Sequence, residues 1–262
     1  MAAMNRGGPM PENTELQMRH VLLGFGTAGC SQPTLSRVVS LAARLRASIQ
    51  NIYVEEPDLA RLAALPFTRE VARYTARIRR LDANLLARRL LARAEELNLL
   101  LQQQAQLEAI ESSFRTLQGE LIPTILREAR DASVTIIPAQ SDWRDIAGET
   151  STTPRIAVAV LYDGSEQAAR ALSLAVTLAE KDSGDLLALI TDARLSSEVN
   201  SLSGIHPVRF SLINGSDEQA ILDRVSMIHP RLFIISADTS LGHSALHIRE
   251  LTRRGVDLML VK

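Results

Sequence analysis

The stretch RIAVAVLYDGSEQAARALSLAVTLAEKDSGDLLALIT, residues 155–191, decides which fold the sequence predicts. It begins with a short apolar run rich in branched residues, continues through an alanine-rich segment with helical spacing, and ends in a second apolar run. Strands that alternate with helices in this way are typical of a parallel sheet covered by helices on both faces. The stretch therefore predicts one strand–helix–strand unit of an α/β fold.

The same order of segments occurs in the first half of the chain. The helical segments LSRVVSLAARL and LSLAVTLAEKD begin at Leu35 and, 137 residues later, at Leu172. The segments FRTLQG and FSLING begin at Phe114 and, only 96 residues later, at Phe210. We interpret this order as a duplication in which the first half carries about 40 extra residues between matching strands.

The duplication predicts two tandem α/β domains with parallel sheets. The expected segments are a disordered N-terminus, a first domain, a linker and a second domain, at 1–18, 19–140, 141–154 and 155–262. The first domain contains a helical insertion at 57–111, predicted as one long helix or as a helical hairpin bent near Leu99. The last helix and strand of the second domain have no counterpart in the first, so the strand at 156–161 is a candidate to border both sheets.

The composition limits the function. Lys and Arg number 29 against 30 Asp and Glu, and this net charge of -1 gives no electrostatic case for a nucleic-acid or membrane partner. The single cysteine, Cys30, cannot form an internal disulfide, which favours a reducing compartment. The N-terminus lacks the apolar core of a signal peptide, and no apolar run approaches the ~20 residues of a membrane span. We therefore expect a cytoplasmic protein.

A formal G-x-G-x-x-G at residues 24–29 follows the first apolar run. In a dinucleotide-binding turn the last glycine lies at the start of the helix. Here Pro33 suits a first helical position and Ser31 or Thr34 a cap, so the helix is predicted to begin beyond the motif. Glu55 could bind a ribose, but it lies further from the first glycine than is usual. A plain loop is favoured, and an NAD-dependent enzyme is kept as a third alternative.

Residues 155–191, with their Asp-Gly-Ser turn, and the duplicated order of elements resemble the universal stress protein family. The resemblance covers about residues 19–262 and implies two tandem Rossmann-like parallel-sheet domains, similar to the adenine nucleotide alpha hydrolases. Many members bind ATP at the carboxyl ends of the strands, as is expected for such sheets. Their phosphate loop follows the fourth strand and reads G-x2-G-x9-G-[ST], in which glycines let main-chain N–H groups surround phosphate.

This sequence departs from that loop in both halves. After LFIISA, Gly242 has no partner glycine three residues to either side, and Asp238 adds negative charge where phosphate would lie. In the first half no glycine follows TIIPA until Gly148, and Gly26 replaces the family's aspartate. We therefore expect ATP binding to be weak or lost.

The resemblance places a retained nucleotide site in the second half, at Asp163, Gly164, Ser165, Asp238 and Gly242. A structural interpretation of the first three is favoured, in which Asp or Ser caps the helix and Gly makes the turn. Adenine-nucleotide binding by the second half, with ATP or AMP as cofactor, is the main alternative.

An arginine stripe is predicted on the insertion. Arg69, Arg73, Arg77 and Arg80 are expected on one side of the long helix, and such a stripe is usually a solvated face. The more specific hypothesis is a surface for an anionic partner, either another protein or a nucleotide.

Three further side chains are weak candidates for chemistry. His243 and His247 are expected to share one solvated helix face, and two ligands do not make a structural zinc site, so no metal is predicted. A nearby helix start could lower the pKa of the Cys30 thiol, although an inert thiol is the default.

We therefore predict a non-catalytic stress-response regulator or scaffold of the universal stress protein type, without a cofactor. Its partner is expected to be a protein that the sequence does not identify. The two halves are expected to pair within the chain as a pseudo-dimer, and a further homodimer through the long helix is open.

Overall fold

The computed structural model describes residues 20–71, 75–140, 156–182, 185–204, 206–213 and 217–262. The N-terminal segment predicted as disordered and the predicted linker at 141–154 lie outside these residues.

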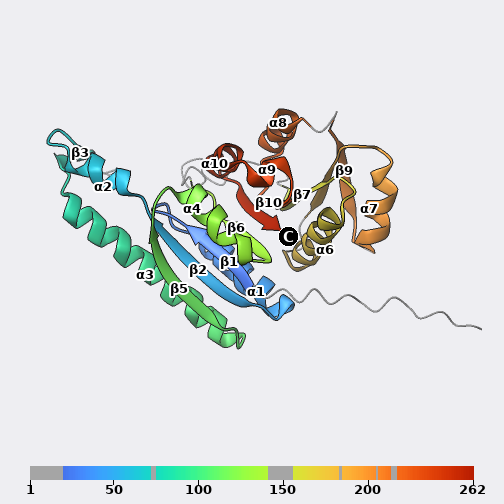
Figure 1. Cartoon of the computed structure of the whole chain (residues 1–262), viewed down its shortest axis with the longest axis horizontal. Helices are drawn as coiled ribbons and strands as arrows, with labels where there is room; N and C mark the ends of the chain where they lie inside the picture. Colours follow the sequence, from blue (N-terminus) through green and yellow to red (C-terminus); the bar gives the residue numbers. More distant parts are fainter. Residues whose placement is uncertain (1–19, 72–74, 141–155, 183–184, 205, 214–216) are drawn as a thin grey trace, which may run out of the picture.

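One sheet of nine strands runs through the described residues, in the order β5-β2-β1-β6-β11-β10-β7-β8-β9 (Figure 1). Neighbouring strands are parallel except β6 and β11, which are antiparallel. The strands are β1 His20–Phe25, β2 Ser48–Glu55, β5 Ser112–Gln118, β6 Val134–Ile137, β7 Val158–Tyr162, β8 Leu186–Ile190, β9 Val208–Leu212, β10 Leu232–Ser236 and β11 Asp257–Val261. The predicted α/β fold class is confirmed, with one sheet that is mostly parallel.

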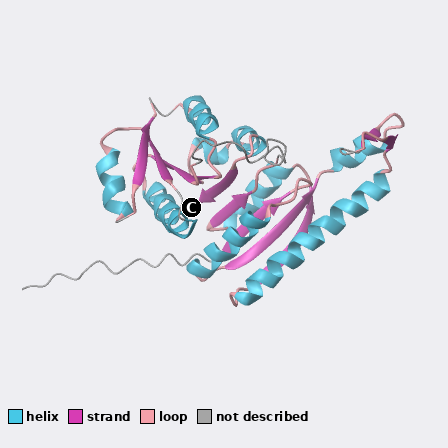
Figure 2. Cartoon of the chain, turned by 180° about the vertical axis from the view of Figure 1, so that it is seen from behind, coloured by secondary structure: helices cyan, strands magenta, loops and turns pink. Residues whose placement is uncertain are grey.

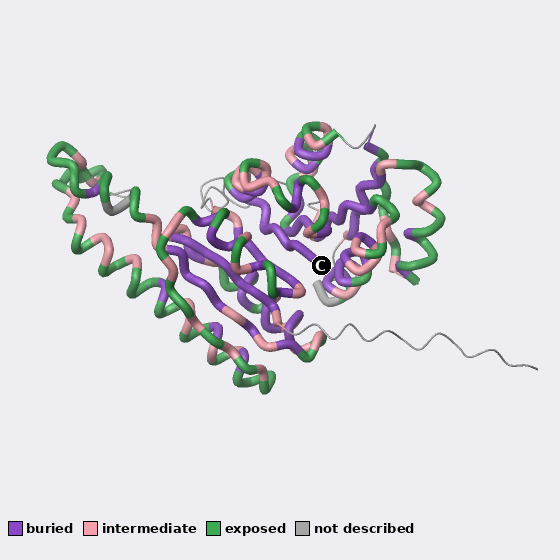
Figure 3. Tube along the Cα trace, viewed as in Figure 1, coloured by how far each residue is buried: buried purple, intermediate pink, exposed green. Residues whose placement is uncertain are grey.

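Helices cover both faces of this sheet (Figure 2). One apolar core lies beneath α1 Gln32–Leu45, α3 Ala83–Leu107, α6 Glu166–Asp182 and α7 Leu195–Ser203. The core on the other face lies beneath α4 Leu121–Glu128, α8 Glu218–Ile228, α9 Ser240–His243 and α10 Ala245–Arg253. A 3-10 turn, η1, spans Ala129–Asp131. The central strands are buried, whereas much of the edge strands β5 and β9 and the outer faces of the helices are exposed (Figure 3).

Helix α1 begins as the sequence predicts. Ser31 is its N-cap, accepting a hydrogen bond from the backbone N–H of Thr34, and Pro33 stands in the first turn. Its buried face includes Leu35 and Val38, and the helix ends where Arg46 adopts a left-handed conformation, with φ of 49°.

The two halves of the sheet meet at β6 and β11. Met259 of β11 lies opposite Ile136 of β6. The prediction that the strand at 156–161 borders both halves is therefore wrong, because β7 lies between β8 and β10. Strand β6 is buried along its whole length, so its main-chain N–H and C=O groups need a neighbouring strand. Since the first half has no fifth strand of its own among the described residues, β11 supplies that neighbour.

The insertion between β2 and β5 differs from the helix that the sequence predicts. Helix α2 spans Pro57–Ala64, and an antiparallel hairpin follows, formed by β3 Arg69–Val71 and β4 Ile78–Arg80. Val71 and Ile78 are opposite each other across this hairpin, so the helix that the sequence predicts for this part of the insertion is wrong. Their branched side chains favour strands, which explains the difference.

We call residues 57–82 the arm. Figure 1 shows that α2 and the hairpin lie away from the sheet, beyond the N-terminal end of α3. Most of the arm is exposed (Figure 3), including the apolar side chains of Phe67, Val71 and Ile78 at 74%, 61% and 62%. The arm therefore presents an apolar surface that the described fold does not cover.

Candidate functional site

Each half has one place where a ligand crevice is expected, outside the carboxyl ends of its parallel strands, and we call these places the first and the second crevice. In sheets of this kind, ligands bind outside the carboxyl ends, where the order of strands reverses. The reversals lie between β1 and β6 in the first half and between β7 and β10 in the second. Because β6 and β11 are antiparallel, the two crevices lie at opposite edges of the sheet.

The first crevice contains a carboxylate from the other half. Asp257, the first residue of β11, is 4% exposed. Its Oδ1 accepts a hydrogen bond of 2.9 Å from the N–H of Ala139, just after β6. Its Oδ2 accepts one of 2.7 Å from the Thr34 hydroxyl, and Arg37 Nη1 lies 3.4 Å away. The Asp257 carboxylate therefore already binds the N–H, hydroxyl and guanidinium groups that an anionic ligand would need at this position.

The three glycines of the G-x-G-x-x-G motif have packing roles. A Cβ at Gly24, inside β1, would lie 2.6 Å from the Ile125 side chain of α4. A Cβ at Gly26 would lie 3.3 Å from Leu121, also on α4. Gly29 has a φ of 77°, which strains other residues. Helix α1 begins only at Gln32, so the motif does not place a helix N-terminus at the last glycine.

The Asp-Gly-Ser turn of the second half caps α6. Asp163 Oδ1 accepts a hydrogen bond of 2.9 Å from the Ser165 N–H, and Ser165 Oγ accepts one of 3.1 Å from Ala168. Gly164 has a φ of 85° in the turn between them. These contacts match the structural interpretation of the three residues, while the exposed Asp163 side chain remains accessible at the mouth of the second crevice.

The turn after β10 also closes on itself. A Cβ at Gly242 would lie 2.7 Å from the carbonyl oxygens of Ser236 and Ala237, so only glycine fits. The Gly242 N–H donates to Thr239 Oγ1 at 3.1 Å, and the Asp238 N–H donates to Ser236 Oγ at 3.2 Å. Both N–H groups are thus satisfied by nearby side chains. The structure brings Asp163 and Asp238 to the same edge of the sheet, at the ends of adjacent strands.

Tyr162, the last residue of β7, is a feature of this crevice that the sequence analysis missed. Its hydroxyl is buried and has no hydrogen-bond partner in the described part of the chain. Burial, and then the nearby Glu198 carboxylate, raise the pKa of this phenol well above its usual range. Within an apolar strand such a tyrosine looks like a core residue, so the sequence offers no signal for it.

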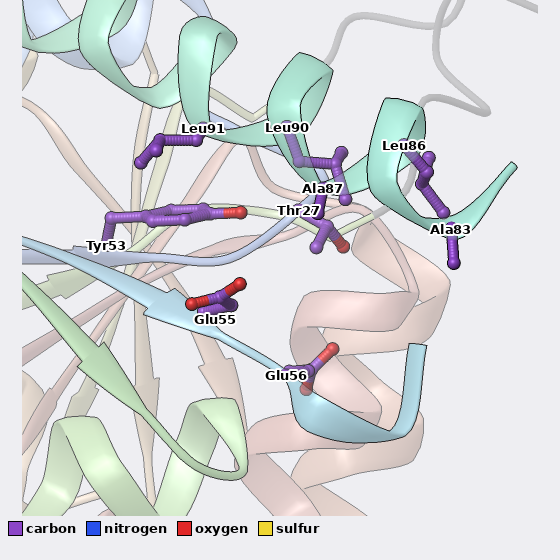
Figure 4. A pocket seen from close by; sticks show the side chains of 9 residues that line it. All are labelled: Thr27, Tyr53, Glu55, Glu56, Ala83, Leu86, Ala87, Leu90 and Leu91. Carbon is purple, nitrogen blue, oxygen red and sulfur yellow. The ribbon is translucent and has the colours of Figure 1, made fainter. Parts of the chain in front are cut away.

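A pocket lies beneath the N-terminal half of α3 (Figure 4). Its polar side is formed by Thr27 in the loop after β1 and by Tyr53, Glu55 and Glu56 at the end of β2. Burial raises the pKa of the Tyr53 hydroxyl, and the charges of Glu55 and then Glu56 raise it further. The sequence indicated an acid at the end of this strand, but not the helix that roofs it.

The remaining candidates do not form a reactive site. His243 ends α9 and His247 lies in α10, because the helix breaks at Ser244, so the predicted shared face is wrong. Burial, followed by the charge of Asp257, raises the pKa of Cys30, which agrees with the inert thiol taken as the default and not with a lowered pKa. Among the described residues no group of three His, Cys, Asp or Glu side chains could hold a metal.

The predicted arginine stripe is wrong as a helix face. Arg69 and Arg80 are opposite each other across the hairpin, Arg77 lies in the turn before β4, and Arg73 lies outside the described residues. Arg69, Arg77 and Arg80 are exposed, so the hairpin still gathers positive charge on the arm.

Comparisons with known proteins concern the fold. No family model matches the sequence, and no curated protein matches it. A universal stress protein from Archaeoglobus fulgidus DSM 4304 is similar over 95% of this chain and 98% of its own, at 16% identity and a TM-score of 0.47. A structure from Pseudomonas aeruginosa UCBPP-PA14 assigned to the same family is similar over 94% of both chains, at 12% identity and a TM-score of 0.43.

A further universal stress protein, solved in complex with cAMP, is similar over 42% of this chain and 98% of its own, at 18% identity and a TM-score of 0.34. Identities and TM-scores this low describe a likeness of fold and carry no conclusion about ligands. No helix in the described residues combines the length and the apolar character needed to cross a membrane.

Proposed function

We propose that this chain is a non-catalytic regulator or scaffold of the universal stress protein type, acting through binding surfaces. The proposal rests on one observation: the residues at the positions where a nucleotide would be expected make contacts that stabilise the fold instead. Asp257 occupies the first crevice, Ser165 caps α6, and Gly242 packs against the main chain after β10.

The surface that we propose for the partner is the arm. Its exposed apolar side chains, Phe67, Val71 and Ile78, lie close in sequence to Arg69 and Arg80. Neither arginine forms an ion pair with a described residue, whereas the neighbouring Arg79 pairs with Glu70 at 2.8 Å. Unpaired cations beside apolar side chains suit a protein segment that is both acidic and apolar.

Two measurements test this function. Calorimetry with ATP, AMP and NAD should show no binding, and micromolar affinity for any of them would overturn the non-nucleotide proposal. For the arm, fluorescence anisotropy should detect binding of a labelled helical peptide rich in Glu and Leu. Binding should fall with salt and be lost when Arg69, Arg77 and Arg80 are changed to Glu.

A matched control changes three exposed arginines outside the arm, Arg194, Arg231 and Arg253, to Glu. This variant carries the same change in net charge and should bind the peptide as the original chain does. Equal loss in both variants would show a general charge effect and would remove the arm from the proposal.

The alternative is adenine-nucleotide binding by the second half. One asymmetry favours it: Asp257 occupies the first crevice, whereas the Asp163 carboxylate at the second crevice is exposed beside the buried Tyr162 hydroxyl. If calorimetry detects ATP or AMP, Asp163→Ala should abolish the signal, and Asp257→Asn should leave it unchanged.

A further inference from the structure

The pocket beneath α3 has an apolar roof and a polar floor. Figure 4 shows the roof side chains directed down from α3 toward Tyr53 and the two glutamates of β2. The roof residues are Ala83, Leu86, Ala87, Leu90 and Leu91. This arrangement suits a ligand with a hydrocarbon part and a polar end. The pocket is independent of the proposed function, which rests on the crevices and the arm.

The Tyr53 hydroxyl offers a hydrogen-bonding group to a ligand in this pocket. Tyr53 is 3% exposed, and its ring packs against Phe25 with centroids 5.7 Å apart. The hydroxyl points into the pocket (Figure 4) and has no hydrogen-bond partner in the described ranges. The ring is buried, but the oxygen itself is accessible from the pocket, so a bound group can reach it. A ligand with a hydrogen-bonding group would satisfy this hydroxyl.

The charge of the pocket selects a cation. Glu55 and Glu56 are half-buried, and neither forms an ion pair within the described residues. Their hydrogen bonds are long, at 3.4 Å from Gln118 Nε2 to Glu55 Oε2 and 3.4 Å from the Leu121 N–H to Glu56 Oε1. Two adjacent carboxylates with weak partners attract a positive charge and repel phosphate.

The size of the pocket restricts that cation. The space inside it that a water-sized group can occupy is about 20 Å³, and one water molecule needs about 10–15 Å³, so only the head of a ligand fits inside and the rest must lie along the open side. An ammonium group is close to water in size and has three N–H donors, and the side chains of Glu55, Glu56 and Tyr53 supply oxygen acceptors in the pocket. We propose that the pocket binds the ammonium end of an alkylamine, with the alkyl part against the leucines of α3.

Calorimetry on the whole chain tests this proposal with n-butylammonium chloride as the probe. Comparison titrations use n-butanol, which lacks the charge, and tetramethylammonium chloride, which lacks N–H donors, at matched ionic strength. We expect a single saturable site for n-butylammonium and none for the other two. Equal heats for n-butylammonium and n-butanol would overturn the proposal.

Variants locate the site. Glu55→Gln and Glu56→Gln should each weaken binding by about tenfold, because each removes a charged acceptor of one N–H. Glu96→Gln, on the exposed face of α3, is the matched control and should bind as the original chain does. Ala87→Leu fills the pocket without changing its charge and should abolish binding, so the proposal is testable even if a charge variant misfolds. Unchanged affinity in Ala87→Leu would overturn it.

A last comparison separates the two sources of an alkylammonium group. A partner protein would supply it as a lysine side chain, represented by Nα-acetyl-lysine N-methylamide. A free amine is represented by n-butylammonium. Tighter binding of the lysine derivative assigns the site to a partner's lysine, and tighter binding of n-butylammonium assigns it to a small amine.

Discussion

The hydroxyl of Thr34, in the first turn of α1, donates a 2.7 Å hydrogen bond to Oδ2 of Asp257, 223 residues further along the chain. The bond joins the first half to the last strand of the second. Since the Asp257 carboxylate also accepts from Ala139 and lies near Arg37, it is a buried charge that several donors stabilise.

Replacing this carboxylate should destabilise the whole chain. Asp257→Ala leaves the Ala139 N–H and the Thr34 hydroxyl without their acceptor and removes one carboxylate from beside Arg37, so the free energy of unfolding in urea should fall by about 3 kcal/mol. The change leaves an empty space beside the Ala139 N–H and the Thr34 hydroxyl, which a formate ion could fill. Added formate should therefore restore part of the lost stability, and chloride should not.

Asp185→Ala is the matched control, since it removes an exposed carboxylate that pairs with Arg209 at 3.1 Å. Its effect should stay below about 1 kcal/mol. If both variants lose equal stability, Asp257 does not join the two halves in the way that its contacts indicate.

Gly24→Ala tests the packing role of the glycine motif. The added methyl would lie 2.6 Å from Ile125, so overpacking should lower the free energy of unfolding by about 1–3 kcal/mol. Adding Ile125→Val makes room, and the double variant should lose less than the two single changes together. Strict additivity, measured by thermal unfolding, would contradict the contact.

Ser165→Ala distinguishes a helix cap from a ligand contact. Loss of the hydrogen bond from the Ala168 N–H should lower the free energy of unfolding by about 1 kcal/mol. Ser165→Asp should keep most of the original stability, because aspartate also caps helices. Circular dichroism during urea unfolding gives both values. An unchanged stability in Ser165→Ala would show that the cap contributes nothing.

Tyr162 makes stability depend on alkaline pH. Its pKa is raised in the folded chain, so the unfolded chain loses the phenolic proton first as the pH increases. The contribution of Tyr162 to the free energy of unfolding is therefore complete below the unfolded pKa of about 10 and is lost as the pH rises above it. Tyr162→Phe should reduce this alkaline loss without destabilising the chain at neutral pH, because the hydroxyl has no hydrogen-bond partner within the described ranges. Identical pH profiles would contradict the assignment.

Much of the sheet could be predicted because its signals are local. The runs HVLLGFG and IQNIYVEE predict strands that the structure places at His20–Phe25 and Ser48–Glu55, and the Ser31 cap was visible in the sequence. The hairpin was missed because Val71 and Ile78 fit both a helical seam and a cross-strand pair. The spacing of these two side chains alone does not distinguish between the two structures.

The site was less predictable than the fold. Asp257 stands in the apolar run VDLMLV and gives no local sign of its partners across the chain. Glu55 and Glu56 were visible as acids that close a strand, but the pocket depends on α3, whose packing the sequence did not specify. The tandem domain boundaries stay a prediction, since one continuous sheet joins both halves.

The pairing of β6 with β11 also bears on how the protein is made. Strand β11 follows β6 by about 120 residues, so at a synthesis rate of about 10 residues per second it leaves the ribosome roughly 12 s later. During that interval the side of β6 that later pairs with β11 is exposed, and its main-chain N–H and C=O groups can pair with a strand of another chain. Nascent chains of this protein should therefore depend on chaperones more than their final stability would suggest.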